Sequence, residues 1–186
     1  MSADGSDIKK WLVNLSPRTL SVTASRLVVT LITQLMVFDS DGNELRCVSL
    51  PDYIAPLHAM EVPTGILVVS HINTKVNQHQ VSIVYTGGQL VRPFTGLAQP
   101  PLDSTPHMAV DSLWGNIILA DRGNRRIVLL SDKLELLKVI IDERQLNYEQ
   151  PVRLCYLEQS GQLLVGLAHR ASVAVFCVKD LMCVIC

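Results

Sequence analysis

The chain is a succession of short apolar segments, each closed by residues that favour turns. Between residues 105 and 140, four segments rich in Ile, Val and Leu are separated by turn residues at 114–116, 121–124 and 131–133. Apolar runs of this length bounded by Gly, Asn and Asp are typical of β-strands joined in hairpins. This stretch therefore predicts one four-stranded antiparallel sheet, which cannot bury both of its faces alone.

The same arrangement recurs along the chain at a near-constant spacing. The third apolar segments of the four units lie roughly 46 residues apart, at Val37, Val84, Leu129 and Val175. A proline also opens each unit, at Pro17, Pro56, Pro106 and Pro151. A period in the mid-forties with four strands per repeat is typical of β-propeller blades. We therefore predict an all-β fold, a β-propeller with about four recognisable four-stranded antiparallel blades.

The predicted blades cover residues 17–50, 56–99, 106–146 and 151–186. Residues 1–7 are expected to be a disordered tail, and residues 8–15 a strand from an earlier blade or one that closes the ring. A polar loop is expected from His71 to Gln80 and a last strand from Leu181 to Cys186. Four blades close only as a tight ring or within an oligomer. An open arc would leave apolar strand edges, which favour a homo-oligomer.

Composition narrows the class of protein. Hydrophobic residues make up 48% of the 186 residues and charged residues 18%, which indicates a globular chain. The net charge of -1 gives no broad basic surface for nucleic acid. No apolar stretch reaches the roughly 18 residues that a spanning helix needs, so no membrane segment is expected. The polar, acidic start is unlike a signal peptide, and the five cysteines lack framework spacing, so we expect reduced thiols and a cytoplasmic location.

The third unit resembles the NHL repeat. The matching residues are Pro106-His-Met-Ala-Val-Asp, Gly115-Asn-Ile-Ile-Leu-Ala-Asp and Asn124-Arg-Arg-Ile. The departures from the family pattern are Met108, where the repeat has glycine, and Leu119, where it has valine. The motif match covers roughly 36 residues, whereas the other units keep only the apolar pattern.

The resemblance implies a propeller similar to the C-terminal domain of tripartite-motif (TRIM) type ubiquitin ligases, which recruits protein or RNA. The zinc-ligand spacing of a RING or B-box does not occur in the sequence, so ligase activity would lie outside it. We therefore predict a non-enzymatic protein-interaction module without a cofactor, recruiting substrate in a ubiquitin-ligase-related protein. The alternatives are a lyase- or lactonase-type propeller enzyme with a pore metal, and a propeller that binds single-stranded RNA.

The loop after the second segment of the third unit holds the basic cluster of the chain. Arg122, Arg125 and Arg126 can contact phosphate or an acidic peptide, and we take them as candidate residues for binding a protein partner. Asp121 and Arg126 flank the turn, where an acid and an arginine can pair and fix the loop. Asn124 supplies a side chain suited to the turn geometry.

Two histidines follow blade-opening prolines and are the remaining candidate binding residues. His58 and His107 occupy positions expected to approach the central pore. The resemblance extends to lyases with similar repeats, in which histidines near these positions hold zinc. A catalytic zinc site needs three protein ligands. The corresponding positions of the other units carry Arg18 and Arg153, so no metal site is expected. No Ser-His-Asp arrangement or phosphate-binding motif is present, so no catalytic residues are predicted.

The last residues, Cys183-Val-Ile-Cys186, have three interpretations. As a metal or redox site, Cys183 and Cys186 lack a second pair of ligands in the sequence. As a lipidation signal at Cys183, the sequence lacks a commonly accepted final residue and a preceding run of basic residues. A cysteine buried in a strand is the favoured interpretation, with lipidation as the alternative. The other histidines, His71, His79 and His169, are expected on solvated loops.

Overall fold

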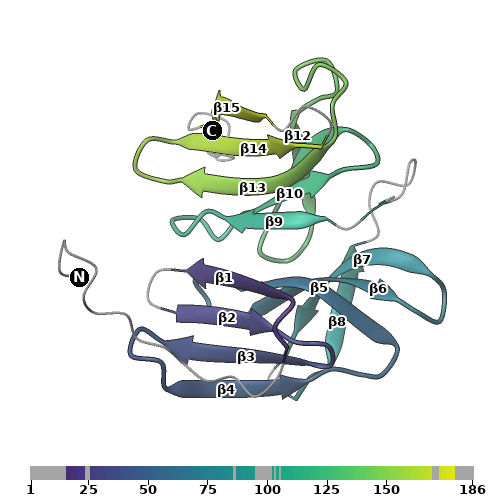
Figure 1. Cartoon of the computed structure of the whole chain (residues 1–186), viewed down its shortest axis with the longest axis vertical. Helices are drawn as coiled ribbons and strands as arrows, with labels where there is room; N and C mark the ends of the chain where they lie inside the picture. Colours follow the sequence, from purple (N-terminus) through teal and green to yellow (C-terminus); the bar gives the residue numbers. More distant parts are fainter. Residues whose placement is uncertain are drawn as a thin grey trace.

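The computed structural model describes residues 16–23, 26–85, 87–94, 102, 104, 106–168 and 172–178. Four antiparallel sheets are arranged as a four-bladed β-propeller (Figure 1), which confirms the predicted fold class. Within the described ranges, no helix is long and apolar enough to cross a membrane. The predictions for residues 1–7, 8–15 and 181–186, including Cys183, and for His169 lie outside the described residues.

Each blade is built from consecutive strands. The first contains β1 (Thr19–Thr23), β2 (Arg26–Thr30), β3 (Gln34–Asp39) and β4 (Glu44–Ser49). The second contains β5 (Ile54–Glu61), β6 (Leu67–Asn73), β7 (Gln78–Val84) and β8 (Leu90–Phe94). The third contains β9 (His107–Val110), β10 (Ile117–Asp121), β11 (Arg126–Leu130) and β12 (Leu136–Ile141). The described part of the fourth contains β13 (Pro151–Leu157), β14 (Gln162–Leu167) and β15 (Val173–Cys177).

Local sequence explains the tight turns between these strands. Between β3 and β4, the Asp39 carboxylate accepts hydrogen bonds from the backbone N–H groups of Asp41 and Asn43, both at 2.9 Å. Gly42 in the same turn has a φ of 89°, which glycine adopts without steric cost. Such aspartate-anchored turns close a hairpin over few residues, so adjacent strands pair in register.

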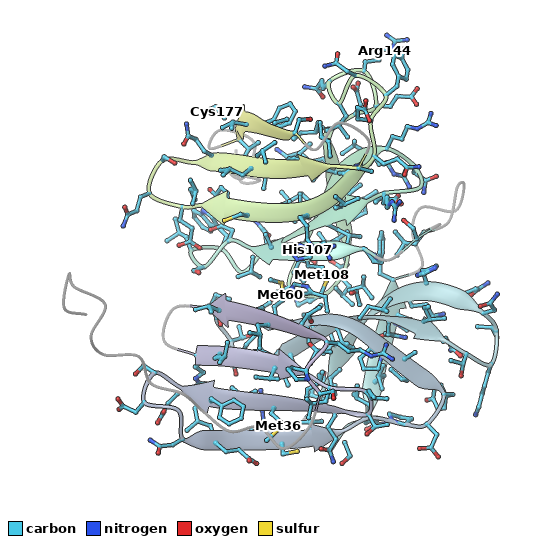
Figure 2. The ribbon with its side chains drawn as sticks, in the orientation of Figure 1. Met36, Met60, His107, Met108, Arg144 and Cys177 are labelled. Atoms are coloured by element: carbon cyan, nitrogen blue, oxygen red, sulfur yellow. The ribbon has the colours of Figure 1, made fainter. Side chains whose placement is uncertain are left out.

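The third blade is covered on both of its faces, and its apolar sequence follows from this position. Along β10, Ile117 and Leu119 belong to a core shared with the second blade, which also holds Met60 and Met108 (Figure 2). The alternating Ile118 belongs to a core shared with the fourth blade. Because neighbouring residues of a strand point to opposite faces, all five residues of β10 are buried.

The innermost strands of the blades lie side by side in chain order. Strand β1 packs against β5, β5 against β9, and β9 against β13. Between the first two blades, the buried Glu61 carboxylate accepts hydrogen bonds from Arg26 at 2.8 Å and Arg46 at 3.2 Å. Consecutive blades are therefore joined both by apolar packing and by polar side chains that reach across.

The polar loop predicted from His71 to Gln80 is wrong. Strand β6 continues to Asn73 and β7 begins at Gln78, and His71 pairs with Gln80 in the ladder. His71 is buried and its Nε2 is 2.9 Å from the Ser82 hydroxyl, whereas its Nδ1 has no hydrogen-bond partner among the described residues. His79 also lies on a strand, so the predicted loop position of both histidines is wrong.

Candidate functional site

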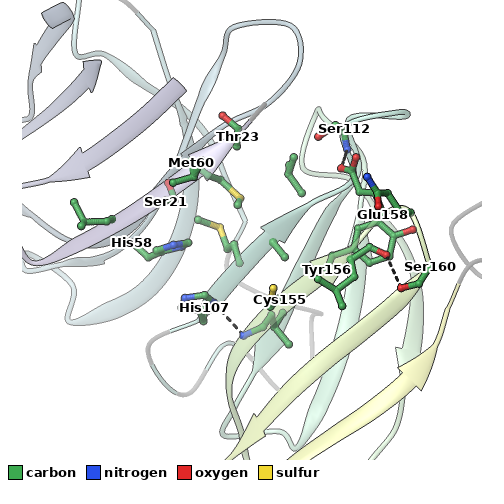
Figure 3. Close-up of a pocket in the computed structure, with 18 residues that line it drawn as sticks. Ser21, Thr23, His58, Met60, His107, Ser112, Cys155, Tyr156, Glu158 and Ser160 are labelled. Atoms are coloured by element: carbon green, nitrogen blue, oxygen red, sulfur yellow. Dashed lines mark hydrogen bonds between the residues drawn. The ribbon is translucent and has the colours of Figure 1, made fainter. Parts of the chain in front are cut away.

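The inner strands surround a cavity of about 730 Å³ (Figure 3). Its walls come from β1, β5, β9 and β13 and from the turn that follows β13. Strands β1 and β13 contribute opposite walls, and His58 and His107 lie between them on β5 and β9 (Figure 3). Every blade therefore contributes side chains to one central space, where a ligand would contact several blades at once.

The two candidate histidines are in direct contact. The rings of His58 and His107 stack with their centroids 4.2 Å apart and an interplanar angle of 23°. The register of β5 shifts between Pro56 and His58, and such a bulge re-aims the side chains that follow it. His107 is the first residue of β9, directly after the buried Pro106. The two blade-opening prolines thus precede the two residues that meet at the cavity.

Both rings are neutral at neutral pH. Burial is the main cause that lowers the pKa of His58 to about 3, and the nearby His107 and Arg153 contribute to this shift. Burial lowers the pKa of His107 to about 4, with Arg153 as the second cause. The Leu154 N–H donates to His107 Nδ1 at 3.2 Å, which places the ring proton on Nε2. Nδ1 of His58 is buried and has no hydrogen-bond partner among the described residues.

Three arginines on the third and fourth blades have no acidic partner among the described residues. Arg153 on β13 is close enough to lower the pKa of both histidines, and its Nη1 donates to the Val152 carbonyl at 2.8 Å. Arg122 follows β10 at the end where Ala120 pairs with His107, and its Nε donates to Gln150 at 3.2 Å. Arg125 is exposed in the same turn. None of the three forms an ion pair within the described part of the chain.

Arg126 has a different environment from the other two arginines of its turn. Its Nη2 and Nε both lie 2.8 Å from Oδ2 of Asp121, a carboxylate that is 1% exposed. Asn124 donates to both carboxylate oxygens at 2.9 Å. Burial raises the pKa of Asp121, whereas the hydrogen bonds from Asn124 and Arg126 lower it. Asp121 and Arg126 therefore hold the turn together, and Arg122 and Arg125 project from it.

The candidate set predicted from the sequence is only partly gathered in one place. His58 and His107 line the cavity, while Arg122 and Arg125 lie in the turn at the same end of the third blade. In the sequence, Arg153 stands only as a residue at a position where two other units have histidine. In the structure it is near enough to lower the pKa of both His58 and His107. Arg18 donates to the Pro56 carbonyl at 3.3 Å and so links the first two blades.

Metal-ligating chemistry is limited in this space. No cluster of three or more His, Cys, Asp or Glu side chains occurs among the described residues. The stacked histidines supply two nitrogen atoms at most for a common ion, whereas catalytic zinc uses three protein ligands. Cys155 also lines the cavity and has a free thiol.

No protein-family model and no curated protein matches the chain. Its fold is similar to Kuenenia stuttgartiensis hydrazine synthase, at 16% identity and a TM-score of 0.62, over 86% of this chain and 58% of that one. A catalytically inactive virginiamycin B lyase from Staphylococcus aureus, with quinupristin, matches at 14% identity and a TM-score of 0.55, over 84% and 54% of the two chains. Kluyveromyces lactis Hsv2 matches at 12% identity and a TM-score of 0.52, over 92% and 52%.

The chain spans a little over half the length of these solved propellers. At such low identity the likeness concerns the fold alone. The solved structures thus support the β-propeller, and the NHL resemblance of the third blade stays a prediction from its sequence.

Proposed function

We propose that the chain is a non-enzymatic protein-interaction module that binds an acidic segment of a protein partner at the cavity mouth. The observation that carries the proposal is a set of three arginines without acidic partners among the described residues. Arg153 lowers the pKa of both neutral histidines, and Arg122 and Arg125 lie in the turn at the end of β10 where Ala120 pairs with His107. A guanidinium group offers five donors in a planar fork that fits a carboxylate. Carboxylates of a partner would supply the missing negative charge.

The histidine pair adds neutral polar contacts to this basic rim. With its proton on Nε2, His107 can donate one hydrogen bond, and His58 keeps one ring nitrogen without a partner. The arginines would therefore attract an acidic segment, and the cavity would select its side chains by shape.

Alanine substitutions separate binding from folding. The Arg122→Ala, Arg125→Ala, Arg153→Ala triple variant is expected to capture its partner from cell extract about tenfold less than wild type, because such anchor contacts dominate interface energies. Arg126 is retained since it holds the turn through Asp121. The matched control is Lys133→Ala with Arg144→Ala, which removes positive charge from other exposed turns. Equal partner capture by the triple variant and the control variant would contradict the site.

The narrower role, substrate recruitment in a ubiquitin-ligase-related protein, rests on the sequence of the third blade alone. It predicts that a captured partner becomes ubiquitylated in cells when the chain is present and not when the triple variant replaces it. If a partner binds normally but is never ubiquitylated, the proposal of an interaction module stands and the proposed link to a ubiquitin ligase is contradicted.

A pore enzyme is the second candidate, and one observation favours it. An unpartnered ring nitrogen of a buried neutral histidine lies at the cavity, and the similar lyase structure is described as inactive with a histidine replaced by alanine. This candidate predicts stoichiometric zinc, measured by metal analysis after dialysis, that is lost in His58→Gln and His107→Gln. We expect no stoichiometric zinc, since the described residues offer only two ligands together.

A further inference from the structure

The central cavity has an apolar wall whose role an acidic segment alone does not explain. Leu20, Val22 and Leu157 line it from the first and fourth blades and are 59%, 76% and 42% exposed. Met60 on β5 and Met108 on β9 complete the wall from the two middle blades (Figure 3). Covering these side chains with another apolar group removes their surface from water, which is favourable. A carboxylate placed against them loses its own water without gaining a partner, so an acidic side chain does not fit this wall.

The two ends of β13 carry opposite charge at the cavity. Arg153, Cys155 and Leu157 alternate along the strand, and because Cys155 and Leu157 line the cavity, Arg153 faces the same side. Glu158 directly follows the strand, and its carboxylate accepts a hydrogen bond from the Ser112 N–H at 2.6 Å. An acidic residue of a partner is therefore attracted to the end with Arg153 and repelled from the end with Glu158. Cys155 and Leu157 lie between these charges, so the space for an apolar group adjoins the place for an acid.

An aromatic side chain fits this space better than an aliphatic one. Methionine sulfur makes favourable contacts with aromatic rings, and both Met60 and Met108 line the cavity. The cavity volume of about 730 Å³ is large enough for an aromatic ring together with the residues beside it. Aromatic side chains bury about 150–250 Å² each and fix only two side-chain torsions when they bind. An aromatic residue therefore covers more of the wall for a smaller loss of conformational entropy.

We propose that the acidic partner inserts one aromatic side chain into the cavity and places a neighbouring acidic residue against Arg153. The ring covers Val22 and Leu157, which are otherwise exposed, and contacts the two methionines. The carboxylate pairs with the Arg153 guanidinium, which has no acidic partner among the described residues. This inference rests on the proposed function, because it assigns the side chain that the acidic partner places in the same site.

Peptides that differ at one position test this assignment. They share a glutamate-rich sequence and carry Trp, Leu or Ala at the centre, and fluorescence anisotropy measures their affinity for the purified chain. The Trp peptide is expected to bind about tenfold more tightly than the Ala peptide, because buried aromatic residues dominate interface energies. Equal affinity for the Trp and Ala peptides overturns the inference and leaves the acidic partner standing. A Leu peptide that binds as tightly as the Trp peptide overturns the aromatic assignment.

Substitutions at exposed cavity positions locate the aromatic side chain. Val22→Ser with Leu157→Ser removes two apolar side chains that are 76% and 42% exposed, so little packing within the chain is lost. In this variant the preference for Trp over Ala is expected to fall to about twofold, because the wall that the ring covers is gone. The Ala peptide is expected to bind as it does to wild type, and circular dichroism verifies the fold.

The matched control for this variant is Ile32→Ser with Val76→Ser. Ile32 and Val76 are 57% and 56% exposed, but they lie in the turns after β2 and β6 and do not line the cavity. The control is expected to keep the full preference for the Trp peptide. An unchanged preference in the Val22→Ser, Leu157→Ser variant places the ring elsewhere and overturns the inference.

A neutral probe separates this inference from the proposed function. If no acidic peptide binds, the proposed function fails, and N-acetyltryptophanamide then tests the cavity without charge attraction. The probe is added at millimolar concentration while the backbone amide signals of the chain are followed by NMR. Shifts that are confined to cavity residues, and that are absent from the Val22→Ser, Leu157→Ser variant, support an aromatic site. The absence of any shift in wild type overturns it.

Discussion

Lowering the pH from 6.5 towards 4 is expected to destabilise the chain steeply. Burial lowers the pKa of His58 to about 3 and of His71 and His107 to about 4, against 6.5 in an unfolded chain. Between these values the unfolded state binds more protons than the folded state. The contribution of the neutral histidines to the unfolding free energy is therefore fully present above pH 6.5 and is lost as the pH falls. Each ring removes about 1 kcal/mol of unfolding free energy per pH unit in this window.

Urea unfolding at a series of pH values between 7 and 4.5 measures this slope. His58→Phe is the control variant, because a phenyl ring retains an aromatic face beside His107 but cannot be protonated. Its slope is expected to be about one third smaller than that of wild type. Burial raises the pKa of Asp111 and Asp121. As the pH falls, these two carboxyls bind protons in the folded state before they do in the unfolded state, so they stabilise the fold in acid and oppose the effect of the histidines. An unfolding free energy that is flat between pH 6.5 and 5 would contradict the buried neutral histidines.

Removing the Asp121 carboxylate is expected to cost about 3 kcal/mol of unfolding free energy, the size found when one partner of a buried ion pair is deleted. Asp121 is 1% exposed and the Arg126 side chain 13%. In Asp121→Ala, Arg126 and Asn124 lose the acceptor that fixes the turn between β10 and β11. The denaturant midpoint, with unchanged slope, reports the loss.

Asp132→Ala is the matched comparison for this variant. Asp132 lies in the next turn of the same blade, between β11 and β12, and has no ion pair among the described residues. A surface substitution of this kind changes stability by about 0.5 kcal/mol or less. If both variants unfold at the wild-type midpoint, the Asp121 turn does not contribute to stability as proposed.

The strands of the third blade could be predicted from sequence because both faces of the blade are buried. Apolar residues then follow one another without interruption along β10 and β11, and the turn residues mark their ends. The hairpin of β6 and β7 was misjudged because polar residues continue beyond its apolar centre. His71 and Gln80 are paired with backbone and side-chain groups inside the sheet, which a count of polar residues does not show.

The parts of the candidate site that depend on local sequence could be predicted, and the parts that depend on packing between blades could not. The pairing of Asp121 with Arg126 depends on one local turn, so the residue types and their spacing suffice to suggest it. The stacking of His58 on His107 depends on how two blades pack, and the sequence indicates only that both approach the axis. Arg153 acts on that pair from the fourth blade, a relation that no local pattern contains.

The most direct test of the binding proposal uses fluorescence anisotropy with labelled peptides and the purified chain. A glutamate-rich peptide is expected to bind, with affinity that falls as salt rises, since charge attraction between exposed groups is screened. The Arg122→Ala, Arg125→Ala, Arg153→Ala variant is expected to lose about tenfold in affinity, and the Lys133→Ala, Arg144→Ala variant to bind as wild type. Preference for an oligouridine over the acidic peptide, or equal peptide binding by both variants, would contradict an acidic partner at the cavity mouth.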